Sequence, residues 1–527
     1  MKKFFISIAF VLTAWGYQSY LYGQQKDYIN WYNGKGAGMQ TDKAYKKLKK
    51  RKSQTVIVAV IDSGIDIEHK DLEGRIWVNE KEIPNNGKDD DNNGYIDDIH
   101  GWNFLGNSKG QNQNDACLEK TRIYKRLRDK YEKVETADIS KKDMEEYKLY
   151  KKVKQEIKEE SERYEMIMKQ LEQLPMILKM VPDMVKNAMG KSEYTLKDLQ
   201  NWKPESDDQE QIKNIAIAME TGELTEAVVE EQKAQIEGML KYNLNPDFND
   251  REFVGDDPYD FTDTKYGNND VEGPDALHGT HVGGIIAAIR GNNLGGDGVA
   301  TDVRLMSLRA VPNGDEHDKD IALAIRYAVD NGASVINMSF GKAYSPNQKE
   351  VFEAMKYADS KGVLLVHAAG NDNANVDETD NFPTSMYPFQ SKKLDHYLTI
   401  GASTRFKTEK LAASFSNYGA TKVDVFAPGH DIYNAVPQSD YKKLNGTSMA
   451  APMVSGVAAL LKSYFPSLSM KEIKDIMLAS ATSYKDTQQF KPGTEDLVKF
   501  GTLSVTGAVI NVKAAVAMCI QKEKSKS

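Results

Sequence analysis

An unbroken run of six apolar residues, Val56–Ile61, constrains the fold of this 527-residue chain more than any other segment. Most of the six are β-branched, and a run without polar alternation is typical of a strand buried on both faces, as in a parallel sheet. Further strands are predicted at 303–311, 333–338 and 362–368, with a helix over 321–329 between them. Because strands alternate with helices, the pattern predicts an α/β fold.

Three polar side chains stand next to predicted elements of this fold. Asp62 ends the first strand, at the edge where open α/β sheets place their chemistry. His278 begins a helix of small residues, and Ser448 lies among small residues where an apolar helix begins. The free N–H groups of a helix N-terminus favour developing negative charge, which suits a nucleophilic serine. Alone, each has a structural interpretation: a turn former, a core histidine and a helix cap.

The order Asp, His, Ser is that of subtilisin, and differs from the orders of chymotrypsin and the α/β-hydrolases. The segments that contain these residues closely resemble the three active-site signatures of subtilisin-like serine peptidases, the subtilases. Two more segments resemble that family's substrate-cleft strand and the segment with its oxyanion asparagine. In chain order the five are Asp62–Gly64, His278–Val282, Ile336–Gly341, Val366–Asp372 and Gly446–Pro452.

The resemblance implies a serine-type endopeptidase with a role for each matched residue. Ser448 would be the nucleophile, His278 its general base and later acid, and Asp62 the group that orients the imidazole. Asn371 would donate a side-chain N–H to the oxyanion, beside the backbone N–H of Ser448. His281, one turn further on, is expected to be structural. The residues expected to bind the substrate backbone are Ser339, Phe340, Gly341, Ala369 and Gly370.

A second class of function is compatible with the same scaffold. A catalytically silent or partner-gated binding protein would keep the peptidase fold without turnover. All four catalytic positions hold the residue types that the chemistry needs, which argues against this class. The implied chemistry requires no cofactor.

The composition limits the classes of molecule that this chain is expected to bind. The net charge is −8, and no basic stripe or nucleic-acid-binding module stands out, so polypeptide substrates are expected and nucleic acids are not. The two cysteines, Cys117 and Cys519, cannot make a disulfide framework. Neither lies in a signature segment, which argues against a thiol nucleophile.

The N-terminus predicts export. Residues 1–23 have two lysines followed by a short apolar run, the pattern of a secretory signal peptide rather than of a membrane span. The mature protein is therefore expected in the periplasm or outside the cell, with no transmembrane segment. Residues 24–54 form a lysine-rich lead-in that is too short for a folded propeptide domain. A polar tail is expected at 521–527.

A large insertion separates Asp62 from His278. The two are 216 residues apart, whereas about thirty separate them in subtilisin. The peptidase domain is expected at 55–114 and 251–520, with the insertion at 115–250. The insertion has 24 Lys/Arg and 30 Asp/Glu among 136 residues, a share well above the 28% of the whole chain.

The insertion is helical by its periodicity. Apolar residues from Tyr150 to Leu174 recur three and four apart, and Pro175 and Pro182 are predicted to interrupt this helix. A second helical stretch is expected from Gln209 to Leu244. The two predict a helical hairpin or small bundle. It is either an inert surface element or a lid or docking arm that contacts a partner or another copy of the chain.

An acidic loop is the remaining candidate site. Residues 89–97 match the opening of an EF-hand calcium loop, with glycine at position 6. Position 12 is His100, so the usual glutamate is missing. A structural calcium ion and a solvated acidic turn both remain open. The predicted ligands are Asp89, Asp91, Asn93, Tyr95 and Asp97.

Overall fold

The computed structural model describes residues 28–222 and 224–526. The signal peptide predicted at 1–23 lies outside the described residues. The described chain forms two compact units: residues 120–248 make one, and residues 28–119 together with 249–526 make the other.

The larger unit is built on a nine-stranded sheet in the order β10-β13-β7-β6-β5-β4-β1-β3-β2. All neighbouring strands are parallel except β10 and β13. The predicted α/β fold with a parallel sheet is therefore confirmed. The strands are β1 (Val56–Asp62), β2 (Gly101–Asn103), β3 (Val303–Arg309), β4 (Val335–Met338), β5 (Leu364–Ala368), β6 (Tyr397–Ser403), β7 (Val425–Pro428), β10 (Thr482–Ser483) and β13 (Ala508–Val509).

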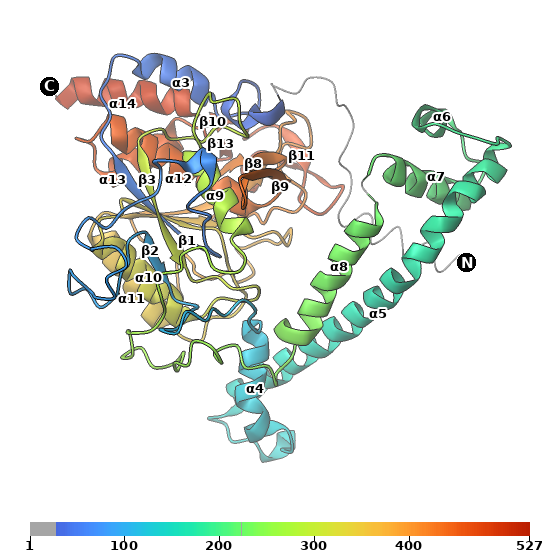
Figure 1. Cartoon of the computed structure of the whole chain (residues 1–527), viewed down its shortest axis with the longest axis horizontal. Helices are drawn as coiled ribbons and strands as arrows, with labels where there is room; N and C mark the ends of the chain where they lie inside the picture. The colour runs from blue at the N-terminus through green and yellow to red at the C-terminus, as the bar shows by residue number, and fades with distance from the viewer. Residues whose placement is uncertain (1–27, 223, 527) are drawn as a thin grey trace. The chain divides into compact units, whose positions relative to one another are not determined.

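Helices cover both faces of this sheet (Figure 1). The β1 strand shows why, because Val58 and Val60 pack into one core while Ala59 and Ile61 pack into the other. Side chains alternate across a strand, so a continuously apolar strand needs an apolar layer on each side. The first layer contains α3 (Thr41–Leu48), α9 (Leu277–Ala287), α12 (Thr447–Tyr464), α13 (Met470–Ala479) and α14 (Val512–Lys526), and the second α10 (Asp318–Asp330) and α11 (Gln348–Ser360).

Two smaller hairpins complete the unit. They pair β8 (Ile432–Val436) with β9 (Asp440–Leu444), and β11 (Gln488–Phe490) with β12 (Leu497–Lys499). Ser469 and Glu472 form a capping box at the start of α13. The last helix begins at Val512, since residues 508–509 pair as β13.

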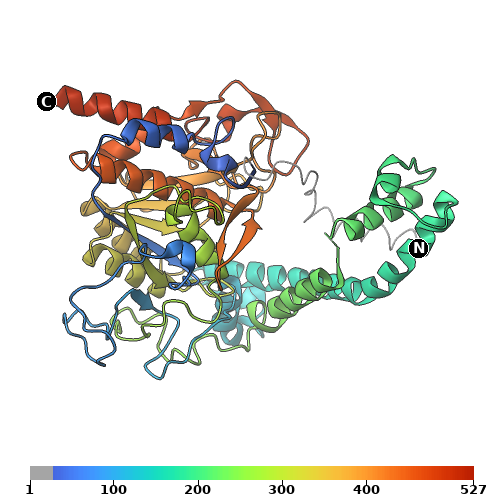
Figure 2. The ribbon, with the colours of Figure 1, turned by 45° about the horizontal axis from the view of Figure 1, so that its top comes forward.

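The N-terminal lead-in belongs to the core of the larger unit. Trp31 and Tyr32 are buried, and Trp31 Nε1 donates to the backbone oxygen of Asp431 at 3.1 Å. The α3 helix lies beside α14 in both ribbon views (Figures 1 and 2). The segment therefore packs as part of the larger unit, which is a structural role that its lysine-rich composition did not indicate.

The smaller unit is entirely helical in its described regular structure. Helix α5 is 46 residues long, and its buried stripe from Leu171 to Val185 packs against α7 and α8. The elements are α4 (Glu119–Tyr131, whose first residue belongs to the larger unit), the 3₁₀ turn Thr136–Asp138, α5 (Met144–Met189), α6 (Leu196–Asn201), α7 (Asp207–Glu220), α8 (Glu226–Gly238) and the π-helical turn Met239–Asn243.

The prediction that Pro175 and Pro182 interrupt the first helix is wrong, because α5 continues through both. A proline removes one backbone hydrogen bond and usually kinks or ends a helix. Here the apolar stripe on either side of the prolines is held by tertiary packing, which outweighs that local cost.

In the described residues, no helix is both long enough and apolar enough to cross a bilayer.

Candidate active site

The ends of three neighbouring parallel strands assemble the site. Asp62 is the last residue of β1, Ser339 follows β4, and Asn371 lies three residues beyond the end of β5. These strands are adjacent in the sheet, in the order β5, β4, β1. Their carboxyl ends therefore meet at one edge, where parallel sheets place ligands and catalytic groups.

Asp62 and His278 form a close pair despite their separation in sequence. His278 Nδ1 donates to Asp62 Oδ1 at 2.6 Å, and Ser63 N–H donates to the same oxygen at 2.8 Å. The approach of α9 to β1 makes this pair possible. A Cβ on Gly279 would lie 2.1 Å from the backbone oxygen of Gly64, so only glycine lets the helix come this near.

The environment of the pair suits a general base. The Asp62 side chain is only 2% exposed, whereas that of His278 is 36% exposed and can reach a substrate. Burial acts to lower the pKa of His278, but the charge and the hydrogen bond of Asp62 outweigh it and raise this pKa above its ordinary value. Asp62 also fixes the tautomer, because its bond to Nδ1–H leaves Nε2 free to accept a proton.

Ser448 is the second residue of α12, so it lies in the first turn of a long apolar helix. Its Oγ donates to the backbone oxygen of Ser339 at 3.1 Å, and Ser339 Oγ donates to the backbone oxygen of Ser448 at 2.8 Å. Within the described residues, no hydrogen bond joins Ser448 to His278. For Ser448 Oγ to bond to His278, it would have to leave the backbone oxygen of Ser339.

Asn371 is oriented by a neighbour of Ser448. Its Oδ1 accepts the backbone N–H of Thr447 at 2.8 Å and the Thr447 hydroxyl at 3.0 Å. Because the side-chain oxygen is engaged by these two donors, the amide NH₂ is directed to the other side. There Nδ2 lies 3.5 Å from where a Cβ on Gly446 would be. This amide can donate to an anion formed beside Ser448.

The residues expected to bind substrate line the same edge. Gly370 has φ +101°, which favours glycine, and its N–H donates to Thr447 Oγ1 at 3.0 Å. The Phe340 backbone oxygen accepts the His367 Nε2–H at 2.8 Å. A cavity of about 220 Å³ opens beside Ala369 and is also lined by Asn381.

Asn381 was not identified from the sequence, since it lies in a polar stretch without a recognisable motif. Its Nδ2 donates to the backbone oxygen of Ala369 at 2.9 Å, and its Oδ1 would lie 2.5 Å from a Cβ on Gly341. It therefore stands between the two segments expected to bind substrate.

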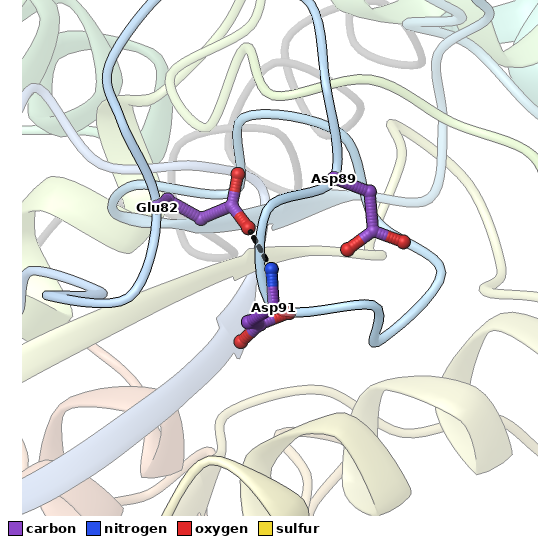
Figure 3. A group of neighbouring side chains, drawn as sticks. All are labelled: Glu82, Asp89 and Asp91. Atoms are coloured by element: carbon purple, nitrogen blue, oxygen red, sulfur yellow. Dashed lines mark hydrogen bonds between the residues drawn. The ribbon is translucent and has the colours of Figure 1, made fainter.

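The acidic loop brings together three carboxylates (Figure 3). Glu82, Asp89 and Asp91 have oxygen atoms within 4.8 Å of one another. Glu82 is 6% exposed, and its Oε1 accepts the N–H groups of Asp90 at 2.9 Å and Asp91 at 3.0 Å. The other oxygen, Oε2, is buried and has no hydrogen-bond partner among the residues that the structure describes. Glu82 was not among the predicted ligands, because it lies outside the loop motif.

The other predicted ligands have different surroundings. Asp97 accepts the N–H groups of Asn86 at 3.1 Å and Gly87 at 2.8 Å, and so holds the turn. Asn93 Oδ1 accepts the Tyr95 N–H at 2.8 Å. The Tyr95 ring packs on Trp102 and Tyr327. Only Asp89 and Asp91 of the predicted set join the three-carboxylate cluster, and the calcium site remains a prediction.

Comparisons of the sequence with known proteins point to one family. The sequence model of the subtilase family matches residues 53–501. The thermophilic serine proteinase of Bacillus sp. (strain AK1) is 40% identical over 220 residues, which cover 42% of this chain and 49% of that protein. Subtilisin DY of Bacillus licheniformis is 36% identical over 217 residues, which cover 41% of this chain and 74% of that protein. The chain thus spans about half the length of the first of these relatives.

Among solved structures, a protease from Pseudoalteromonas arctica PAMC 21717 matches at 18% identity with a TM-score of 0.47. That match covers 94% of this chain and 97% of the other.

The second histidine of the His278 segment has a structural environment. His281 is fully buried, and its Nε2 contacts the backbone oxygens of Ile432 at 3.0 Å and Lys442 at 3.1 Å, one on each strand of the β8–β9 hairpin. Burial lowers the pKa of His281 to about 3. The neutral imidazole therefore holds this hairpin to α9.

Because the unfolded chain binds a proton on His281 near pH 6.5 and the folded chain only near pH 3, acid favours unfolding. We expect the free energy of unfolding to fall as the pH is lowered from 6.5 towards 3. His281→Gln should lower stability at neutral pH but reduce this slope by up to about 1.4 kcal/mol per pH unit. Urea unfolding at several pH values measures the slope, and equal slopes in the variant and the wild type would contradict the assignment.

Proposed function

Because the chain belongs to the subtilase family of serine proteases, we propose that it is an exported endopeptidase that hydrolyses polypeptides through Asp62, His278 and Ser448. The observation that supports this most directly is the 2.6 Å bond from His278 to Asp62, at the sheet edge where Ser448 lies in the first turn of α12. A buried carboxylate, a partly exposed imidazole and a serine in the first turn of a helix are together the parts that acyl transfer requires.

The reaction would begin when His278 Nε2 takes the proton of Ser448 Oγ as that oxygen attacks the substrate carbonyl. Asp62 holds the imidazole and stabilises its charged form. The oxyanion then receives hydrogen bonds from Asn371 Nδ2 and the backbone N–H of Ser448. His278 returns the proton to the leaving amine, and water hydrolyses the resulting acyl-enzyme by the same steps in reverse.

Substrates would bind as extended peptides. The backbone of Ser339–Gly341 lies beyond the end of β4 and that of Ala369–Gly370 beyond the end of β5, on the two sides of Asn381. An extended peptide can add to such segments through its main-chain groups, as in strand addition.

Two parts of the proposal concern regions away from the reacting groups. Export rests on the signal-peptide pattern of residues 1–23. A contact between the helical unit and another polypeptide is supported by Met166, Met176 and Met180 of α5, which are 51–70% exposed. Exposed methionines adapt to varied apolar partners.

We also propose that the acidic loop binds a structural calcium ion through Glu82, Asp89 and Asp91. Calcium prefers carboxylate oxygens, and a buried carboxylate oxygen without a partner is costly unless a cation compensates it. Glu82 Oε2 is such an atom. Calcium here would stabilise the loop that leads into β2 and would take no part in the chemistry.

A fluorophosphonate probe tests the nucleophile. The wild type should be labelled and Ser448→Ala should not, and the variant should lose about a millionfold in kcat on a peptide substrate. Ser467→Ala, which removes an exposed hydroxyl that contacts Glu523, is the matched control and should be labelled like the wild type. Labelling of Ser448→Ala would exclude Ser448 as the nucleophile. A wild type that resists labelling would favour the silent binding protein.

Asp62→Asn tests the orienting carboxylate. The amide cannot hold the same imidazole tautomer, so kcat should fall about 10⁴-fold. The acidic limb of kcat/KM should also move to lower pH, because His278 must be neutral to act and loses the charge that raises its pKa. Asp475→Asn, at an exposed site on α13, should change neither quantity. An unmoved limb would contradict the role of Asp62.

Chelation tests the calcium site. EDTA should lower the melting temperature of the wild type, and added calcium should restore it. In Glu82→Gln this calcium-dependent part should disappear, since the variant loses one ligand charge. Glu80→Gln changes the same charge at an exposed position two residues away and should behave like the wild type. A wild-type melting temperature that ignores EDTA would exclude the site.

A further inference from the structure

Lys342 directly follows the Ser339–Gly341 segment, and its ammonium group is buried. The side chain is 2% exposed. Its Nζ lies 2.9 Å from Glu119 Oε2, 2.9 Å from Asp318 Oδ1 and 2.7 Å from the backbone oxygen of Glu316. A buried cation with three oxygen partners has little freedom to move, because any displacement separates charges in a low-dielectric interior.

The backbone of Lys342 links the Ser339–Gly341 segment to the segment that contains Asn381. Its N–H donates to the Phe382 oxygen at 3.1 Å, and the Phe382 N–H donates back to the Lys342 oxygen at 2.9 Å. The residue before Phe382, Asn381, donates to the backbone oxygen of Ala369. Lys342 therefore determines how far Gly341 lies from the Asn381 segment and, through it, from Ala369.

One of the anion partners, Glu119, connects this site to the insertion. Glu119 is 2% exposed and is the first residue of α4, with which the helical insertion begins. Its N–H donates to Asp315 Oδ2 at 2.7 Å. The returning end is anchored to the same region, because Arg251 forms bonds of 2.7 and 3.2 Å with Asp320, in the first turn of α10.

Ser339 is held in place by other contacts. Asn337 Nδ2 donates to Ser339 Oγ at 2.9 Å, and that hydroxyl donates to the Ser448 backbone. Loss of the Lys342 anchor should therefore displace Phe340 and Gly341 while leaving the nucleophile in place.

We propose that Glu119 and Lys342 are positioning residues that hold the backbone of Ser339–Gly341 in register with a bound peptide. Their ion pair ties this segment to the first residue of α4. The inference rests on the proposed peptidase function and adds a determinant for the binding of extended substrates. The first residue of α4 thereby affects how the enzyme binds a peptide, whereas the positions of Asp62, His278 and Ser448 stay unchanged.

The test compares full-length wild type with Glu119→Gln, which removes one anion and leaves Asp318 to pair with Lys342. We expect KM for a fluorogenic tetrapeptide amide to rise about 10- to 100-fold, because a small misplacement of a binding segment is costly. The tetrapeptide kcat and the rate of labelling by a small fluorophosphonate, which needs no extended pairing, should each change less than about twofold. Lys342→Met should give the same selective loss.

Glu160→Gln is the matched control. Glu160 lies 2.5 Å from Lys120, the residue after Glu119, so the variant makes the same charge change within the helical unit. It should leave KM and labelling unchanged. Equal losses of labelling and tetrapeptide hydrolysis in Glu119→Gln would indicate a merely structural role and overturn the inference, as would an unchanged KM. Absence of labelling in the wild type would instead overturn the proposed function, and this inference with it.

Discussion

The hydrogen bond between His278 Nδ1 and Asp62 Oδ1 joins residues that are 216 positions apart, and the rest of the site depends on it. It requires α9 to approach the end of β1 so closely that a Cβ on Gly279 would lie 2.1 Å from the backbone oxygen of Gly64. Parallel strands bring their carboxyl ends to one edge, so the same arrangement places Ser339 and Asn371 near Ser448. The sheet thus provides the geometry, and the close helix contact completes it.

The large insertion is compatible with this geometry because its two ends meet within the larger unit. The Cys117 N–H donates to Asp250 Oδ2 at 3.2 Å, and Asp250 in turn lies 3.3 Å from His317 Nε2. A long loop whose ends stay together adds only a slowly growing entropic cost to folding. The charges buried at these ends hold one arrangement, since a displaced partner would leave an uncompensated ion.

Much of the fold and of the site could be predicted because the signals are local. The apolar run of β1 depends only on neighbouring residues, and this strand was predicted from the sequence. The helix break at Pro175 was predicted by the same local logic and was wrong, because packing of α5 against α7 and α8 is not visible in a short window. Glu82, Asn381 and Lys342 follow no motif, and their surroundings come from residues outside their own segments.

The sequence by itself determined the fold class, the family resemblance and the identities of the expected catalytic residues, because these depend on residue type, order and local periodicity. Only the tertiary structure decided which side chains meet. It placed the Glu82 carboxylate beside Asp89, gave His281 a buried structural site, and paired Glu119 with Lys342 behind the substrate edge. Desolvation and hydrogen-bond partners set these roles, and both depend on how separate segments of the chain pack together.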